Sequence, residues 1–309
     1  MKRMLSLNDN SLNIDEIDEI NSSRNRRGMR HYSTHISTRP KLFLEEKEDI
    51  LISLSKKQHK LNDYSKDKES IIFSERQNVI QWCLQVFEKI EIEENQENSI
   101  FHRFCTGYDY VMEKYFLLNK ILKKQDELKI MIITLFLLAY KMEGLLLDEL
   151  TISSLIDSFM KENKTNKGEL IDRVVKNEMN IITILDFNPQ IFNDNNIHQI
   201  SYILFDLFVK KYLLKFSGKE EKKIHNALDF INKSIQFSDK MLFKYYPIDK
   251  AMLSFYSAVE YSIERKNILD ALKKYNRYLR NNIQIIKLTK EDFDNYCKKF
   301  KKIMNKNKI

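Results

Sequence analysis

The stretch that most constrains the fold is residues 126–144. Between Ile130 and Tyr140 it contains no charged side chain. Its apolar residues recur all the way round a helix instead of forming one stripe, which predicts a helix buried on every side. The stretch is too short to cross a bilayer, which takes about 20 apolar residues. We therefore predict a central core helix with Asp126 as its N-cap and Gly144 as its left-handed C′ residue.

The scarcity of turn-forming residues points the same way. The chain has 309 residues but only 5 Gly and 3 Pro, and sheet proteins of this size normally need more of both at their turns. Leu, Ile, Lys and Glu are abundant, as in helical proteins. We therefore predict an all-α protein, and the length corresponds to about two domains.

The positive charge is placed mainly at the two ends of the chain. The formal net charge is +8, of which residues 287–309 supply +5 and residues 1–40 supply +2. Residues 41–286 are left with +1. A nearly neutral body gives little support to a nucleic-acid footprint on the fold. On this basis nucleic acid is not an expected partner.

Cysteines and motifs argue against several functional classes. Cys83, Cys105 and Cys297 are odd in number and have no CxxC spacing, which predicts a reducing compartment and no zinc site. His31 and His35 are four residues apart, but they fall in a polar tail where we expect no metal site. The sequence has no Gly-rich phosphate loop, HExxH or GxSxG, so we expect neither catalysis nor a cofactor. It shows no secretory signal and no membrane span, and the expected location is the nucleus, the cytoplasm or both.

The hydrophobic pattern divides the chain into five parts. Residues 1–42 are predicted to be a disordered tail, and residues 43–69 a helix with a linker. Residues 70–189 form a first helical domain, residues 190–284 a second, and residues 285–309 a basic C-terminal helix or tail. The segment 91–98 is interpreted as an acidic linker. The predicted helices span 43–61, 74–90, 99–119, 126–144, 151–160, 168–186, 197–216, 220–236, 238–245, 247–263, 267–280 and 289–304.

Three motifs follow one another in the first domain. Arg76 and Trp82 lie in the helix predicted over 74–90, and His102 and Asp109 are seven residues apart in the next helix. The sequence Leu-Ala-Tyr-Lys-Met-Glu then occupies 138–143, at the end of the central helix.

Two further motifs complete the series. Glu178 is followed by an apolar pattern through Phe187, and the second domain has Phe-Ser-Asp at 237–239 and Lys-Tyr-Tyr-Pro at 244–247, with Ala251 after them. In this order over residues 70–280, the five motifs resemble those of the cyclins. The resemblance implies the cyclin fold, with an N-terminal cyclin box and a C-terminal cyclin-like domain as two tandem five-helix domains.

By this resemblance the chain is a regulatory subunit and not an enzyme. It would bind and activate the catalytic subunit of a cyclin-dependent serine/threonine kinase in cell-cycle control. Lys141 and Glu178, on adjacent helices of the family fold, would make polar contacts to the kinase, and Leu145 and Leu146 would add apolar area. Taken alone, a lysine at a helix C-terminus also complements the helix dipole, and a mid-helix glutamate often faces solvent. Both interpretations remain open at this point.

The same resemblance gives other residues structural roles. Arg76 and Asp109 would form a salt bridge that holds the first two helices of the box together. Trp82 and Ala139 would belong to the core.

The chain departs from the family at the substrate-docking patch. Glu75 and Asn78 on the first helix and Lys129 on the third replace groups that form an apolar groove. We therefore expect an Arg-x-Leu substrate motif to bind poorly or not at all. Arg39 and Leu42 have the Arg-x-x-Leu form of a destruction box, although this spacing is common by chance and the segment also leads into the next helix.

Two other functions remain open. The chain could be a cyclin-fold adaptor associated with transcription, using the basic segment 287–309. It could also be a helical scaffold with a degenerate cyclin box and no kinase partner.

Overall fold

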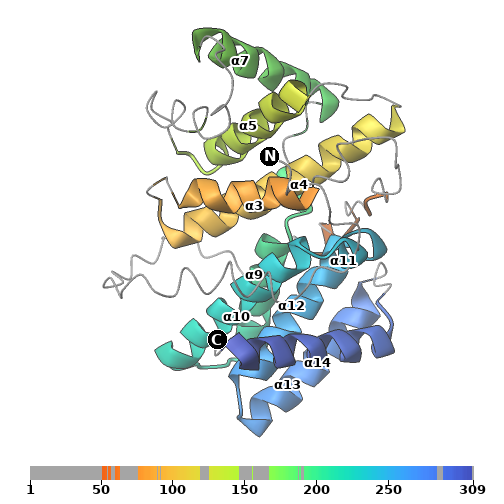
Figure 1. Cartoon of the computed structure of the whole chain (residues 1–309). Helices are drawn as coiled ribbons and strands as arrows, with labels where there is room; N and C mark the ends of the chain where they lie inside the picture. The colour runs from red at the N-terminus through yellow and green to blue at the C-terminus, as the bar shows by residue number, and fades with distance from the viewer. Residues whose placement is uncertain are drawn as a thin grey trace.

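The computed structural model describes residues 51–53, 55–56, 60–62, 76–88, 90, 92–118, 125–145, 155, 167–186, 188, 191–283 and 288–307. Every regular element in these ranges is an α-helix, which confirms the predicted all-α class (Figure 1). The tail 1–42, most of the helix predicted over 43–61, and all of 151–160 except Leu155 lie outside the described residues. The helices are α3 (Arg76–Phe87), α4 (Glu94–Leu117), α5 (Gln125–Lys141), α7 (Lys167–Ile184), α8 (Ile191–Asp194), α9 (Ile197–Lys211), α10 (Gly218–Gln236), α11 (Asp239–Lys244), α12 (Pro247–Ser262), α13 (Lys266–Asn282) and α14 (Lys290–Asn307).

The first hydrophobic core surrounds α5, as the uncharged stretch predicts. From Leu128 to Tyr140 every residue of α5 is buried except Lys129 and Leu138, which are half-buried. Helices α4 and α7 pack directly against α5. Gly144 has φ +74° and its N–H donates to the Lys141 carbonyl at 2.9 Å. This is the left-handed ending predicted for the helix.

A second core surrounds α12, which packs against α9, α10, α13 and α14. Helix α14 contributes Phe293, Phe300 and Met304 to this core, each at most 3% exposed. The basic C-terminal segment is therefore an integral helix of the second core.

The chain passes from the first core to the second between Phe192 and Ile197, and within the described residues it returns to the first core at Phe237, Leu242 and Phe243. Phe192, on the short α8, belongs to the first core, whereas Ile197 begins the second. Gly107 of α4 allows α8 to approach, because a Cβ at Gly107 would lie 2.0 Å from Cε1 of Phe192. The passage thus falls a few residues after the boundary predicted at 189.

Two predicted helix ends are wrong by five residues, and Asp126 is not the N-cap of α5 because that helix already includes Gln125. The segment 91–98 was interpreted as a linker, but α4 begins at Glu94 and Asn98 is 2% exposed. Carboxylates are favourable at a helix N-terminus, where they complement the dipole, so an acidic run does not exclude a helix start. Helix α9 ends at Lys211 and not at 216. Leu213 takes a left-handed φ of 48°, and the Leu214 N–H closes the end onto the Val209 carbonyl at 2.9 Å.

Polar contacts join the two cores along α4 and α10. The Asn98 amide donates to Oδ2 of Asp229 at 2.9 Å. Lys233 lies 3.8 Å from Glu97. These contacts, with the ring of His102 described below, form a polar seam between the two halves.

Candidate functional site

Lys141 and Glu178 come together at the end of α5 and the middle of α7. The Lys141 ammonium donates to both carboxylate oxygens of Glu178, at 2.7 and 2.8 Å. The side chain of Lys141 is 52% exposed and that of Glu178 is 26% exposed. The proximity expected from the resemblance is therefore present, although 37 residues separate the two in sequence.

Two apolar side chains lie exposed beside this ion pair. Val175 and Met179, on the turns of α7 next to Glu178, are 61% and 60% exposed. On a helical projection they lie about 120° and 160° from the centre of the buried stripe of α7, which Leu170, Val174 and Ile181 form. Their exposure therefore follows from the helical period. Leu145 is half-buried against the first core, and Leu146 lies outside the described residues.

This arrangement is suited to recognition. An exposed ion pair contributes at most about 1 kcal/mol to stability, so the fold does not depend on it. Charged groups beside exposed apolar side chains are the usual components of a protein-binding surface, where the apolar groups supply buried area and the charges supply specificity.

Between α3 and α4, Arg76 and Asp109 form the expected salt bridge. The guanidinium of Arg76 donates from Nε to Oδ1 at 2.6 Å and from Nη2 to Oδ2 at 2.9 Å. Both side chains are almost fully buried, at 3% and 1% exposure. The third donor, Nη1, reaches the Gln236 carbonyl at 2.7 Å. No motif predicted this last bond, which links α3 to the second half.

Trp82 and Ala139 both pack in or against the first hydrophobic core, as expected. Ala139 is fully buried. Trp82 is half-buried and packs against the first core, with its ring 5.9 Å from Phe136 and 6.2 Å from Phe104, centroid to centroid.

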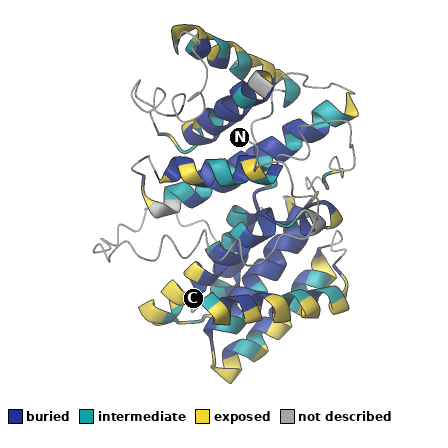
Figure 2. Cartoon of the chain, in the orientation of Figure 1, coloured by how far each residue is buried: buried dark blue, intermediate teal, exposed yellow. Residues whose placement is uncertain are grey.

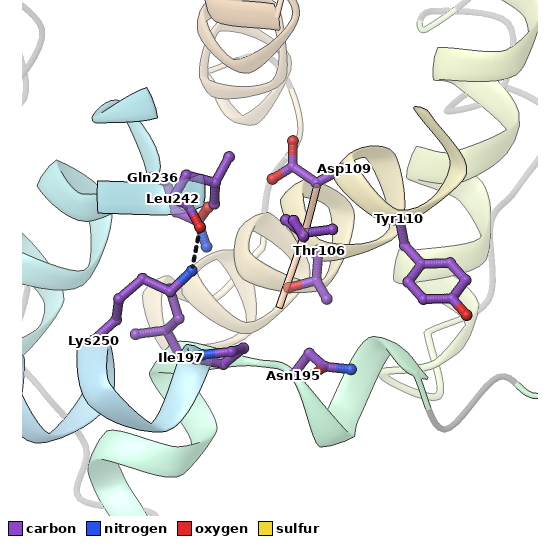
Figure 3. Close-up of a pocket in the computed structure, with 10 residues that line it drawn as sticks. Thr106, Asp109, Tyr110, Asn195, Ile197, Gln236, Leu242 and Lys250 are labelled. Carbon is purple, nitrogen blue, oxygen red and sulfur yellow. Dashed lines mark hydrogen bonds between the residues drawn. The ribbon is translucent and has the colours of Figure 1, made fainter. Parts of the chain in front are cut away.

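A pocket next to the salt bridge contains a residue that sequence reasoning missed (Figure 3). Lys250 of α12 is 2% exposed, and its ammonium donates to the Leu242 carbonyl at 3.0 Å. Burial lowers the pKa of Lys250 to about 7, and the positive charge of Arg76 acts in the same direction. A single lysine in an amphipathic helix is normally interpreted as solvent-exposed, so no local signal marks it. The pocket is lined by Leu61, Thr106, Asp109, Tyr110, Asn195, Ile197, Gln236, Leu242, Pro247 and Lys250.

The described residues also define the chemistry of the thiols. Cys83, Cys105 and Cys297 are free and buried. Burial raises the pKa of Cys105, and it raises that of Cys297 to about 12. Both thiols are therefore protonated at neutral pH and are poor nucleophiles. The described part of the chain brings no three or more His, Cys, Asp or Glu side chains into a metal-ligating group.

No model of a known protein family matches this sequence, and no curated protein is significantly similar to it. Among the described helices, none combines the length and the apolar content needed to span a membrane.

Proposed function

We propose that this chain is a divergent cyclin: a regulatory subunit that binds and activates a cyclin-dependent serine/threonine kinase in cell-cycle control. The observation that carries the proposal is the Lys141–Glu178 pair, half-exposed where α5 ends beside α7. The family resemblance expects these two residues to be adjacent and accessible to a kinase. Neither side chain belongs to the hydrophobic core, and the exposed pair adds little to the stability of the fold. A binding role therefore accounts for their placement better than a structural one.

Two further observations support the proposal. The buried, bidentate Arg76–Asp109 pair joins α3 to α4, the helices that would open the cyclin box. The division into two hydrophobic cores, one around α5 and one around α12, is compatible with a cyclin box followed by a cyclin-like domain. The two-domain cyclin fold itself remains part of the proposal.

In this proposal the chain acts by selecting one conformation of the kinase. Activity requires the αC-helix glutamate of the kinase to pair with the lysine that holds the ATP phosphates. Lys141 and Glu178 contact polar groups near the start of αC, and Val175 and Met179 bury apolar area against it. A partner that binds the active arrangement more tightly than the inactive one shifts the population toward activity.

The test is co-purification of the intact chain with its kinase. The variant Lys141→Ala with Glu178→Ala should reduce kinase recovery and kinase activity at least about tenfold, because removing charged groups that bond to a partner within an interface costs roughly 2 kcal/mol or more. The matched control is Lys244→Ala with Asp292→Ala, another exposed ion pair, at 3.1 Å between α11 and α14. The control should associate like the wild type.

Unchanged kinase association in the Lys141/Glu178 variant would reject the assignment of these residues. Absence of any kinase from the purified wild-type protein would instead favour the helical scaffold.

A further inference from the structure

The two halves of the molecule carry opposite net charge. Residues 197–309 contain 24 Lys or Arg and 12 Asp or Glu, a net of +12. Residues 41–196 contain 21 and 27, a net of −6. Residues 197–286 alone carry +7, so the +1 of residues 41–286 is the sum of +7 and −6 and hides two opposite charges. Net charge separated in this way creates a potential that attracts polyanions to one end of the molecule.

The densest part of this charge is on α14. From Lys298 to Asn307 this helix has five lysines and no acidic residue. Lys298, Lys299, Lys301 and Lys302 are exposed, and within the described part of the chain none of the four pairs with a carboxylate. Lysines four residues apart on a helix repel one another, which destabilises the helix by a few tenths of a kcal/mol. The stability of the helix therefore does not explain why these lysines are gathered on one face.

The packing of α14 limits what the face can bind. The apolar side of α14, including Phe293, Phe300 and Met304, is buried in the second core. The helix therefore has no free apolar side chains to insert into a bilayer, as an interfacial membrane helix requires. All of its exposed side chains are Lys, Glu, Asp or Asn. A protein interface normally has apolar or aromatic residues at its centre and few charges there, and this face has no such centre.

We propose that the outer face of α14 binds the phosphate backbone of nucleic acid without reading its sequence. The lysine ammonium is a point charge suited to single phosphates, and the face lacks the arginines that usually read base edges. Lys298, Lys302 and Lys306 follow one another at about 6 Å along the helix. A duplex carries one charge per about 1.7 Å of its axis, so successive lysines can meet separate phosphates. Helix α14 lies at the opposite end of the molecule from α7 (Figure 1), with exposed residues along its outward edge (Figure 2). The inference is thus independent of the proposed kinase contact.

The test is fluorescence anisotropy of the full chain with a labelled DNA duplex and a labelled single-stranded RNA, each of arbitrary sequence. Between about 50 and 200 mM salt, log K for the duplex should fall with log[salt] with a slope near −0.9 for each phosphate contacted. The quadruple variant Lys298→Gln, Lys299→Gln, Lys301→Gln, Lys302→Gln should bind at least about tenfold more weakly at low salt and should lose about three units of slope. Comparing the DNA and RNA arms identifies the preferred backbone.

The control removes the same charge elsewhere on the same half, with Lys215→Gln, Lys219→Gln, Lys266→Gln and Lys274→Gln, all at exposed positions. It should retain most of the affinity and the slope. Far-UV circular dichroism should show the same helix content in all three proteins, and if the quadruple variant is unfolded, the Lys298→Gln/Lys302→Gln pair should give about half the loss of slope. Equal loss in the control would overturn the assignment to α14. Absence of binding at low salt, or equally tight binding to phosphatidylserine vesicles or polyglutamate, would overturn nucleic-acid recognition.

Discussion

Lys250 carries an amino group that is almost fully buried, at 2% exposure, and this makes the stability of the protein depend on pH. Its folded-state pKa is about 7, lowered mainly by burial from 10.5. Between these two values the unfolded chain holds a proton that the folded protein has lost, so stability rises with pH across this window. Below pH 7 both states are protonated and the full cost of burying the charge is present. We predict that Lys250→Met raises the free energy of unfolding near pH 7, by on the order of 1–3 kcal/mol.

Urea unfolding at about pH 6.5 and about pH 9.5 measures this effect. The wild type should gain stability between the two values relative to Lys250→Met. The exposed Lys274→Met serves as the control and should follow the wild type at both. A Lys250→Met protein less stable than the wild type near pH 7 would contradict the prediction, and would mean that the bond to the Leu242 carbonyl outweighs the desolvation.

The contacts of a single residue could be predicted from the sequence only where the residue belongs to a motif. The Arg76–Asp109 pair could be expected because both residues stand in ordered motifs, and a buried arginine needs a carboxylate partner. Lys250 belongs to no motif, and its burial results from packing between segments distant in sequence. The same limit applies to the bond from Arg76 to Gln236, which are 160 residues apart.

At the scale of elements, the contact between α4 and α8 depends on the missing side chain of Gly107. A Cβ at this position would lie 2.0 Å from Cε1 of Phe192 and 2.8 Å from two further atoms of the same buried ring. We predict that Gly107→Ala destabilises the protein by about 1–3 kcal/mol, as overpacking of a core does, despite the better helix propensity of alanine.

Thermal or urea unfolding of Gly107→Ala, alone and with Phe192→Leu, tests this contact. The second substitution should recover part of the loss, because the smaller side chain makes room for the added methyl group. Gly218→Ala is the matched control, since a Cβ there meets no atom within 4 Å. Equal effects of Gly107→Ala and Gly218→Ala would argue against a steric origin.

Helix positions were largely predictable, but helix ends were predictable only where a local signal marks them. The uncharged run in α5, the turn at Gly144 and Pro247 at the first turn of α12 are strong local signals, and each lies where predicted. The end of α9 was missed because Leu213 takes a left-handed conformation that is usually adopted by glycine. The start of α4 was missed because its acidic first turn resembles a linker in composition.

At the scale of the whole molecule, periodicity predicts which face of each helix is buried but not which helices share a core. The chain forms two cores, and polar contacts such as Asn98 with Asp229 and Lys233 with Glu97 join the two halves. Apolar contacts join them as well, because Phe237, Leu242 and Phe243 come from the second half but pack in the first core. The polar contacts leave no periodic trace in the sequence. Charge was misjudged for a related reason, because a total over both halves concealed their opposite signs.

His102 connects this polar seam to pH. It is fully buried, stacks on His198 with ring centroids 5.1 Å apart, and has Nδ1 3.4 Å from the Gln236 amide nitrogen. Burial holds the pKa of His102 well below 6.5, with His198 and Lys233 adding to the effect. Below pH 6.5 the imidazole of the unfolded chain binds a proton that the folded protein does not. The free energy of unfolding therefore decreases as the pH is lowered, by up to about 1.4 kcal/mol per pH unit. His102→Gln should abolish this part of the acid sensitivity while keeping an acceptor near Gln236.

Urea unfolding at about pH 7.5 and about pH 5.5 would measure the difference between the two proteins. Trp82, the single tryptophan of the chain, reports on the first core by fluorescence, and far-UV circular dichroism reports on all the helices. The wild type should lose more stability than His102→Gln by both probes. His102 lies between the cores, so acid should weaken the coupling between them. At about pH 5.5 the unfolding transition followed by fluorescence should therefore differ from the one followed by circular dichroism more in the wild type than in the variant. Identical pH dependence of the two proteins would show that His102 is not the group through which acid acts on the seam.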